Sequence, residues 1–192
     1  MSEANNPPLT LPTKRVIIVH GWADDPAKGW IAWLVSELRS RGVEAIAPAM
    51  PSPKKPDIDT WLHYLQQVIG LIDSQTVLVG HSLGAYVLLR YLDKCTDPHK
   101  LGKLILVGGF AGHERATQGK HVLPEVDFAT IRAKVEQIYS VYSDDDTVIP
   151  PEWSAALGES LGGHNVIDPG KGHFAGLHGC TELPSVLEII LD

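Results

Sequence analysis

The sequence has few cysteines and little clustered positive charge. Its two cysteines, Cys95 and Cys180, form no CxxC pair, so we expect free thiols rather than a disulfide. Lys and Arg number 16 against 23 Asp and Glu, and the one basic cluster is the pair Lys54-Lys55. The formal net charge of -7 argues against nucleic-acid binding, because phosphates are held by clustered Lys and Arg.

Long hydrophobic runs are also missing. The longest apolar stretches, such as residues 103–110, are far shorter than the roughly 18 residues that span a bilayer. Residues 1–8 have neither the basic region nor the apolar region of a secretory signal. We therefore expect a soluble, cytoplasmic protein that binds no membrane.

Patterns for metals and nucleotides are absent from the sequence. No cluster of His, Cys and Asp has ligand spacing, and residues 144–146 do not form a calcium loop. No Walker or dinucleotide-binding glycine pattern follows the first expected strand. Neither a metal nor a cofactor is expected.

From residue 14 onward, short β-branched runs alternate with longer amphipathic segments, which predicts an α/β fold with a parallel sheet. Residues 1–13, rich in Pro, Asn and Thr, predict a flexible arm before a single domain at 14–192. Strands are expected at 15–19, 43–47, 76–79, 103–107, 137–142 and 165–167, and helices at 29–41, 58–72, 84–93, 152–161 and 183–191. These elements predict about six parallel strands with helices on both faces. Two stretches, 50–57 and 108–127, are long enough to be functional loops, and the second could form part of a substrate wall.

The motif that carries chemistry is Gly80-His81-Ser82-Leu83-Gly84, which fits G-x-S-x-G. A strand precedes it and a helical pattern follows it, as in the strained turn that presents a nucleophilic serine. The two glycines leave room for the neighbouring strand and helix to approach closely. A tight turn without chemistry is the alternative, and the flanking elements favour Ser82 as a nucleophile.

A serine hydroxyl needs a base to take its proton, and in this fold the base follows later in the chain. Among nine histidines, His173 is the best candidate because it follows the last expected strand and lies at the carboxyl edge of the sheet. His178 is its main competitor. Four others are interpreted as surface histidines: His63, His99, His121 and His164.

The acid that orients this base is expected in the loop after residue 142, where Asp144, Asp145 and Asp146 are adjacent. Only one of them can reach the imidazole. The four-residue spacing to Pro150 favours Asp146, while the other two could cap the next turn or remain solvated. Asp146 would hold the imidazole tautomer and stabilise the imidazolium.

Acyl transfer also requires N–H donors for the oxyanion. One is expected from Leu83, directly after the nucleophile, and the other from Trp22 in the His20-Gly21-Trp22 loop after the first strand. Gly21 permits the sharp turn that aims the Trp22 N–H inward. His20 is interpreted as a buried histidine that supports this loop rather than a catalytic group.

Together these residues resemble the small serine hydrolases of the retinoblastoma-binding-protein-9 and YdeN type, within the α/β-hydrolase superfamily. The resemblance covers nearly all of residues 14–191. It depends on the following segments: His20-Gly21 with Trp30 and Trp33, Met50-Pro51-Ser52-Pro53 with Trp61, residues 80–84, Gly109-Phe110, Asp145-Asp146 with Pro150, and Gly172-His173-Phe174 with Thr181-Glu182-Leu183-Pro184.

The resemblance implies a triad of Ser82, Asp146 and His173, a sheet shorter than that of larger hydrolases, and no large lid. It also implies esterase-like activity on small substrates. The polar stretch 112–119 departs from the family pattern, so the resemblance does not define the wall of the pocket there. An acyl pocket could be lined by Trp22, Trp30, Phe110, Leu123 and Phe174, although each of these could equally belong to the core.

The leading hypothesis is hydrolysis of small carboxylic esters through an acyl-enzyme. Thioesters and amides fit the same chemistry, and the sequence does not choose among leaving groups. The alternative from another class is a protein-binding module on a hydrolase scaffold, because a fold alone does not establish activity. The sequence does not indicate an oligomeric state.

Overall fold

The computed structural model describes residues 14–112, 123–176 and 179–192. Its centre is a parallel sheet with the order β2-β1-β3-β4-β5-β6. The strands are β1 (Arg15–Val19), β2 (Glu44–Ile46), β3 (Thr76–His81), β4 (Leu101–Val107), β5 (Val135–Tyr142) and β6 (His164–Ile167). The strand order reverses next to β1, and in open α/β sheets such a reversal marks where ligands bind, outside the carboxyl ends of the strands.

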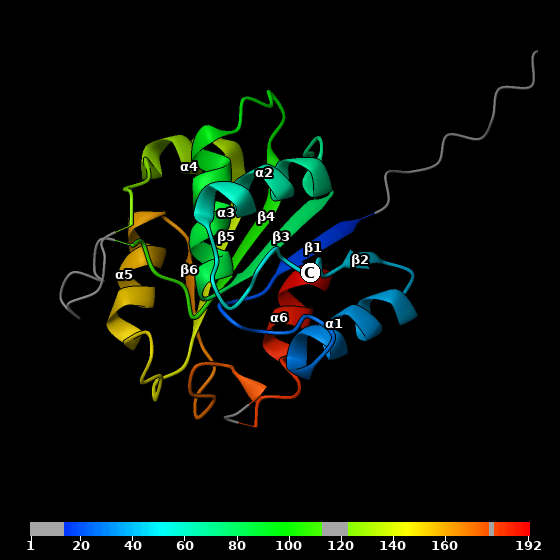
Figure 1. Ribbon diagram of the computed structural model, residues 1–192, viewed down its shortest axis with the longest axis vertical. Helices are drawn as coiled ribbons and strands as arrows, with labels where there is room; N and C mark the ends of the chain where they lie inside the picture. Colours follow the sequence, from blue (N-terminus) through cyan, green and yellow to red (C-terminus); the bar gives the residue numbers. More distant parts are fainter. Residues whose placement is uncertain (1–13, 113–122, 177–178) are drawn as a thin grey trace, which may run out of the picture.

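Helices cover both faces of the sheet (Figure 1). Helices α1 and α6 lie together on one face, and α2, α3 and α4 lie on the other, with α5 beside β5 and β6. The helices are α1 (Gly29–Ser40), α2 (Ile58–Ile69), α3 (Leu83–Lys94), α4 (Phe128–Lys134), α5 (Pro151–Ser160) and α6 (Pro184–Leu191). In the described part of the chain, no lid domain is inserted between these elements.

Two hydrophobic cores result, one on each face of the sheet. Strands β3 and β4 are buried along their whole length and feed alternate side chains to the two cores. Leu78 and Leu104 pack toward α2 and α3, while Val77 and Ile105 pack toward α1 and α6. This double burial explains why the central strands are near-continuous apolar runs in the sequence.

The predicted α/β fold, with its six parallel strands, is confirmed. Strand β1 has the expected bounds, and the other strands differ from the expected ones by one or two residues, at both ends in β2 and at one end in the rest. One helix, α4, was not predicted. It has seven residues and buries only Ile131, and it begins where the Asp127 carboxylate accepts the N–H groups of Ala129 and Thr130.

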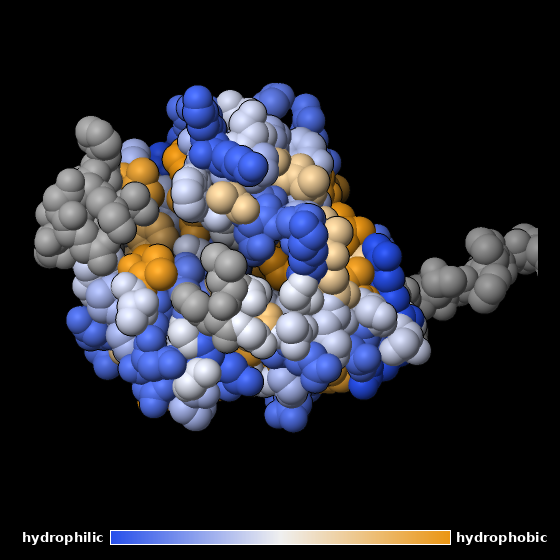
Figure 2. All heavy atoms as spheres, turned by 60° about the horizontal axis from the view of Figure 1, so that its bottom comes forward, coloured by the Kyte–Doolittle hydropathy of each residue, from blue (hydrophilic) through white to orange (hydrophobic). Residues whose placement is uncertain are grey.

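One face of the molecule is drawn in Figure 2. On it, hydrophilic residues predominate and hydrophobic residues appear in separate patches among them. Within the described ranges, no helix combines the length and the apolar character that crossing a membrane requires. Both cysteines are free thiols, as predicted, with Cys180 buried and Cys95 half-buried.

Candidate active site

Ser82 lies on a strained turn between β3 and α3. Its backbone has φ of 51° and ψ of -117°, in a region that residues with a side chain rarely adopt. Its N–H donates to the Val107 carbonyl at 2.9 Å, which fixes the turn to the end of β4. The strain presents the hydroxyl at the carboxyl edge of the sheet.

The two glycines of the motif allow the close packing that this turn needs. A Cβ at Gly80 would lie 2.6 Å from the Cα of Ala85, and one at Gly84 would collide with the carbonyls of Val19 and His20. The first turn of α3 therefore packs directly against β1. Leu83 opens this helix, where N–H groups have no acceptor within the helix.

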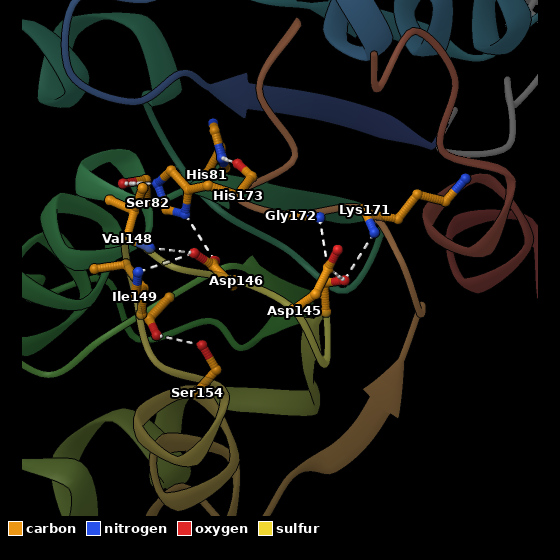
Figure 3. A network of polar contacts seen from close by, with 12 residues as sticks. His81, Ser82, Asp145, Asp146, Val148, Ile149, Ser154, Lys171, Gly172 and His173 are labelled. Carbon is orange, nitrogen blue, oxygen red and sulfur yellow. Dashed lines mark hydrogen bonds and ion pairs between the residues drawn. The ribbon is translucent and has the colours of Figure 1, made fainter. Parts of the chain in front are cut away.

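The structure brings His173 to the serine. Its Nε2 lies 2.9 Å from the Ser82 Oγ, across 91 residues of sequence (Figure 3). The imidazole is buried, and it is carried by the segment after β6, as the sequence predicted. The competitor His178 lies outside the described residues, as does His121, while His63, His99 and His164 make no contact with Ser82.

Asp146 lies on the other side of the imidazole. Its Oδ2 accepts the Nδ1–H of His173 at 2.8 Å, and its side chain is 1% exposed. Its Oδ1 accepts the N–H groups of Val148 and Ile149 at 2.8 and 2.9 Å. The hydroxyl, imidazole and carboxylate thus form one line of hydrogen bonds, seen in Figure 3.

Asp144 and Asp145 hold the segment that precedes the imidazole. The Oδ1 of Asp144 accepts the Gly170 N–H at 2.9 Å, and the Oδ1 of Asp145 accepts the Gly172 N–H at 2.8 Å. Both residues remain exposed to solvent, as one of the two alternatives from the sequence expected, and they accept these backbone N–H groups as well. Their carboxylates tie the loop after β5 to the loop after β6, because backbone N–H groups there need acceptors.

The loop after β1 lies against the nucleophile. A Cβ at Gly21 would be 3.2 Å from the Cβ of Ser82, so a larger residue would crowd the hydroxyl. His20 is fully buried beneath this loop, where its Nδ1–H donates to the Gly21 carbonyl and its Nε2 accepts the Met50 N–H at 3.0 Å. Burial lowers the pKa of His20, which matches the supporting role expected from the sequence.

A cavity of about 930 Å³ opens above Ser82 and His173. All five residues proposed for the pocket line it: Trp22, Trp30, Phe110, Leu123 and Phe174. Trp30, Phe110 and Phe174 are at most 2% exposed and also belong to the cores, so they serve as wall and core together. Trp22 is 63% exposed and stands at the mouth. Half of the predicted loop 108–127, residues 113–122, lies outside the described residues.

Two residues of the cavity were not singled out from the sequence. His81, inside the serine motif, is 3% exposed and donates its Nε2–H to the His173 carbonyl at 2.9 Å. Asp24, two residues after Trp22, has an Oδ2 that lies 3.7 Å from the Nδ1 of His81. Only the position of His81 next to Ser82 could have drawn attention to it. Among the residues described, no group of three or more His, Cys, Asp or Glu could hold a metal ion.

Residues 16–191 match the serine hydrolase family. The hydrolase YdeN of Bacillus subtilis is 31% identical over 93% of this chain and 95% of its own length. Its crystal structure superposes with a TM-score of 0.86, covering 93% of this chain and 97% of that one. The serine hydrolase RBBP9 of Rattus norvegicus is 26% identical over 95% of this chain and 96% of its own length. Est1E of Butyrivibrio proteoclasticus, solved with ferulic acid bound, shares the fold at 18% identity and a TM-score of 0.71, over 93% of this chain and 87% of that one.

Proposed function

The chain belongs to the serine hydrolase family, and from that premise we propose that it hydrolyses small carboxylic esters through an acyl-enzyme on Ser82. The observation that carries the proposal is the continuous line of hydrogen bonds from Ser82 through His173 to Asp146. A hydroxyl 2.9 Å from a buried imidazole can lose its proton as it attacks, because the imidazole takes that proton.

In the proposed first step, the Ser82 Oγ attacks the ester carbonyl carbon while its proton moves to the Nε2 of His173. The developing oxyanion accepts hydrogen bonds from the N–H groups of Leu83 and Trp22. The buried Asp146 carboxylate stabilises the imidazolium, which then protonates the leaving alcohol as the C–O bond breaks. A water molecule, activated by the same imidazole, releases the acid and restores the serine.

Esters are proposed over amides because an alcohol leaves a tetrahedral intermediate more readily than an amine does, and thioesters would react by the same steps. Ferulic acid in Est1E shows that this fold can hold an aromatic acid, in that protein. Here Trp30, Phe110 and Phe174 supply apolar walls, and we propose that they contact the substrate together with Trp22 and Leu123.

Labelling by a fluorophosphonate probe tests the proposal. Wild-type protein should be labelled on Ser82 and should hydrolyse a panel of p-nitrophenyl esters, and Ser82→Ala should lose both activities. A matched control is Ser185→Ala, which removes the hydroxyl that bonds Asp168 away from the cavity and should leave labelling intact. Equal labelling of wild type and Ser82→Ala would overturn the nucleophile. Absence of turnover, with a partner bound equally by both proteins, would favour a binding module.

A further inference from the structure

Two hydrogen-bond acceptors meet inside the cavity without a donor between them. The Nε2 of His81 must carry a proton, because its partner is the His173 carbonyl, which can only accept. In the neutral imidazole the Nδ1 therefore presents a lone pair. This Nδ1 is buried without a hydrogen-bond partner, and it faces the Asp24 Oδ2 at 3.7 Å, beyond hydrogen-bond length.

The Asp24 carboxylate is charged and only partly compensated. Its side chain is 36% exposed, and its Oδ1 accepts the Asp25 N–H at 2.8 Å. Burial raises the pKa of Asp24, yet its pKa lies below the ordinary value, and the hydrogen bond from the Asp25 N–H is one of the causes. It is therefore a carboxylate at neutral pH.

Among the described residues that line the cavity, the one Lys or Arg is already paired with another residue. Lys28 lines the cavity, but its Nζ lies 3.0 Å from the Asp25 Oδ2. A carboxylate in a largely apolar cavity is costly unless an opposite charge or donor approaches it. The space beside Asp24 thus suits a group that brings both a positive charge and N–H donors.

We propose that this corner of the cavity binds an ammonium group of the substrate, held by the Asp24 Oδ2 and the His81 Nδ1. The inference rests on the proposed ester hydrolysis and narrows its substrates to esters that carry a protonated amine. His81 adjoins Ser82 in the chain, and its ring centroid lies 5.0 Å from that of His173, so the ammonium would bind one side chain away from the reacting groups. Esters with a negative group should be poor substrates for the same reason.

Matched pairs of esters test the proposal. On the alcohol side, 2-(dimethylamino)ethyl butyrate carries a protonated amine where 3-methylbutyl butyrate carries a CH group. On the acyl side, methyl 6-aminohexanoate carries an ammonium where methyl heptanoate carries a methyl group. The measured quantity is the ratio of kcat/KM for the cationic ester to that for its neutral partner. Differences in intrinsic reactivity cancel when this ratio is compared between protein variants.

Asp24→Asn should lower this ratio about tenfold in at least one pair, the size expected for an ion pair in a half-buried site. The control is Glu44→Gln, which removes the same charge at an exposed position on β2 outside the cavity and should keep the wild-type ratio. The butyrate ester of choline is charged but has no N–H donor. Its kcat/KM should exceed that of 3-methylbutyl butyrate by a smaller factor than the kcat/KM of the dimethylamino ester does.

The outcomes separate this inference from the proposed function. If Asp24→Asn slows both members of each pair equally, the residue only positions His81, and the ammonium site is wrong while ester hydrolysis stands. If wild-type protein hydrolyses neither member of either pair, nor any p-nitrophenyl ester, the proposed function itself fails. Thermal unfolding of Asp24→Asn close to that of wild type ensures that the ratio reports on the folded protein.

Discussion

Asp146 divides its two carboxylate oxygens between two tasks. Oδ1 accepts two backbone N–H groups of its own loop, and Oδ2 accepts the Nδ1–H of His173. An oxygen fixed by the backbone cannot rotate away, so the imidazole meets an acceptor in a constant position. This division means that the residue's structural and chemical contributions can be separated by one substitution.

Asp146→Asn keeps the Oδ1 that the backbone needs and replaces the other oxygen with an NH₂ donor. That donor favours the imidazole tautomer with its proton on Nε2, which cannot accept from Ser82. We expect kcat/KM for p-nitrophenyl butyrate to fall about 10³ to 10⁴-fold, with thermal unfolding little changed. Glu44→Gln is again the charge control. A loss of less than tenfold would mean that another group orients the base.

For single residues, site positions that follow strands could be predicted from the sequence. Positions whose role depends on packing could not. Ser82 and His173 could be found because each lies in the segment that follows a predicted strand, and such segments meet at one edge of a parallel sheet. Choosing Asp146 from three aspartates depended on its spacing to Pro150. The pairing of His81 with Asp24 depends on how the loop after β1 folds over the serine turn, and no sequence spacing encodes that.

Among the elements, the contact of α3 with β1 determines where the nucleophile lies. Helix α3 is buried along nearly every residue of its first two turns. The Gly84 backbone packs closely against the carbonyls of Val19 and His20. The position of the helix therefore depends on the same loop that would supply the Trp22 N–H. The two expected oxyanion donors are therefore positioned by one packing contact.

Gly84→Ala should disturb this contact. The added Cβ has no room against two backbone carbonyls, so the helix or the strand must shift, at a cost of about 1–3 kcal/mol in the free energy of unfolding. Urea unfolding measures it. Gly176→Ala is the matched control, since a Cβ there meets no atom within 4 Å. Equal unfolding midpoints for the two variants would contradict the packing argument.

Helix α4 shows why short elements escape prediction. Its seven residues bury only Ile131, so no apolar periodicity marks it. A signal was present in Asp127, followed three residues later by Thr130, whose backbone N–H and hydroxyl both bond the aspartate. Caps of this kind are common in turns as well, and only packing against α3 settles the choice.

Across the whole molecule, the net charge of -7 adds a long-range attraction for cations to the local one at Asp24. The two attractions respond differently to salt. The field of dispersed surface charges is screened within about 10 Å at 0.1 M salt and about 3 Å at 1 M, whereas a direct contact in a half-buried cavity is screened much less. Ionic strength can therefore separate a selective site from a general preference for positive substrates.

Raising NaCl from 0.05 to 0.5 M should lower the ratio of kcat/KM for cationic and neutral esters by a similar factor in wild type, Glu44→Gln and Asp24→Asn. The gap of about tenfold between wild type and Asp24→Asn should persist at 0.5 M, because the ammonium would touch the carboxylate with little water or salt between them. If the two proteins converge at high salt, the preference for cations belongs to the acidic surface as a whole. Steady-state kinetics at each salt concentration, with the matched ester pair for which Asp24→Asn shows this gap, would decide between these origins.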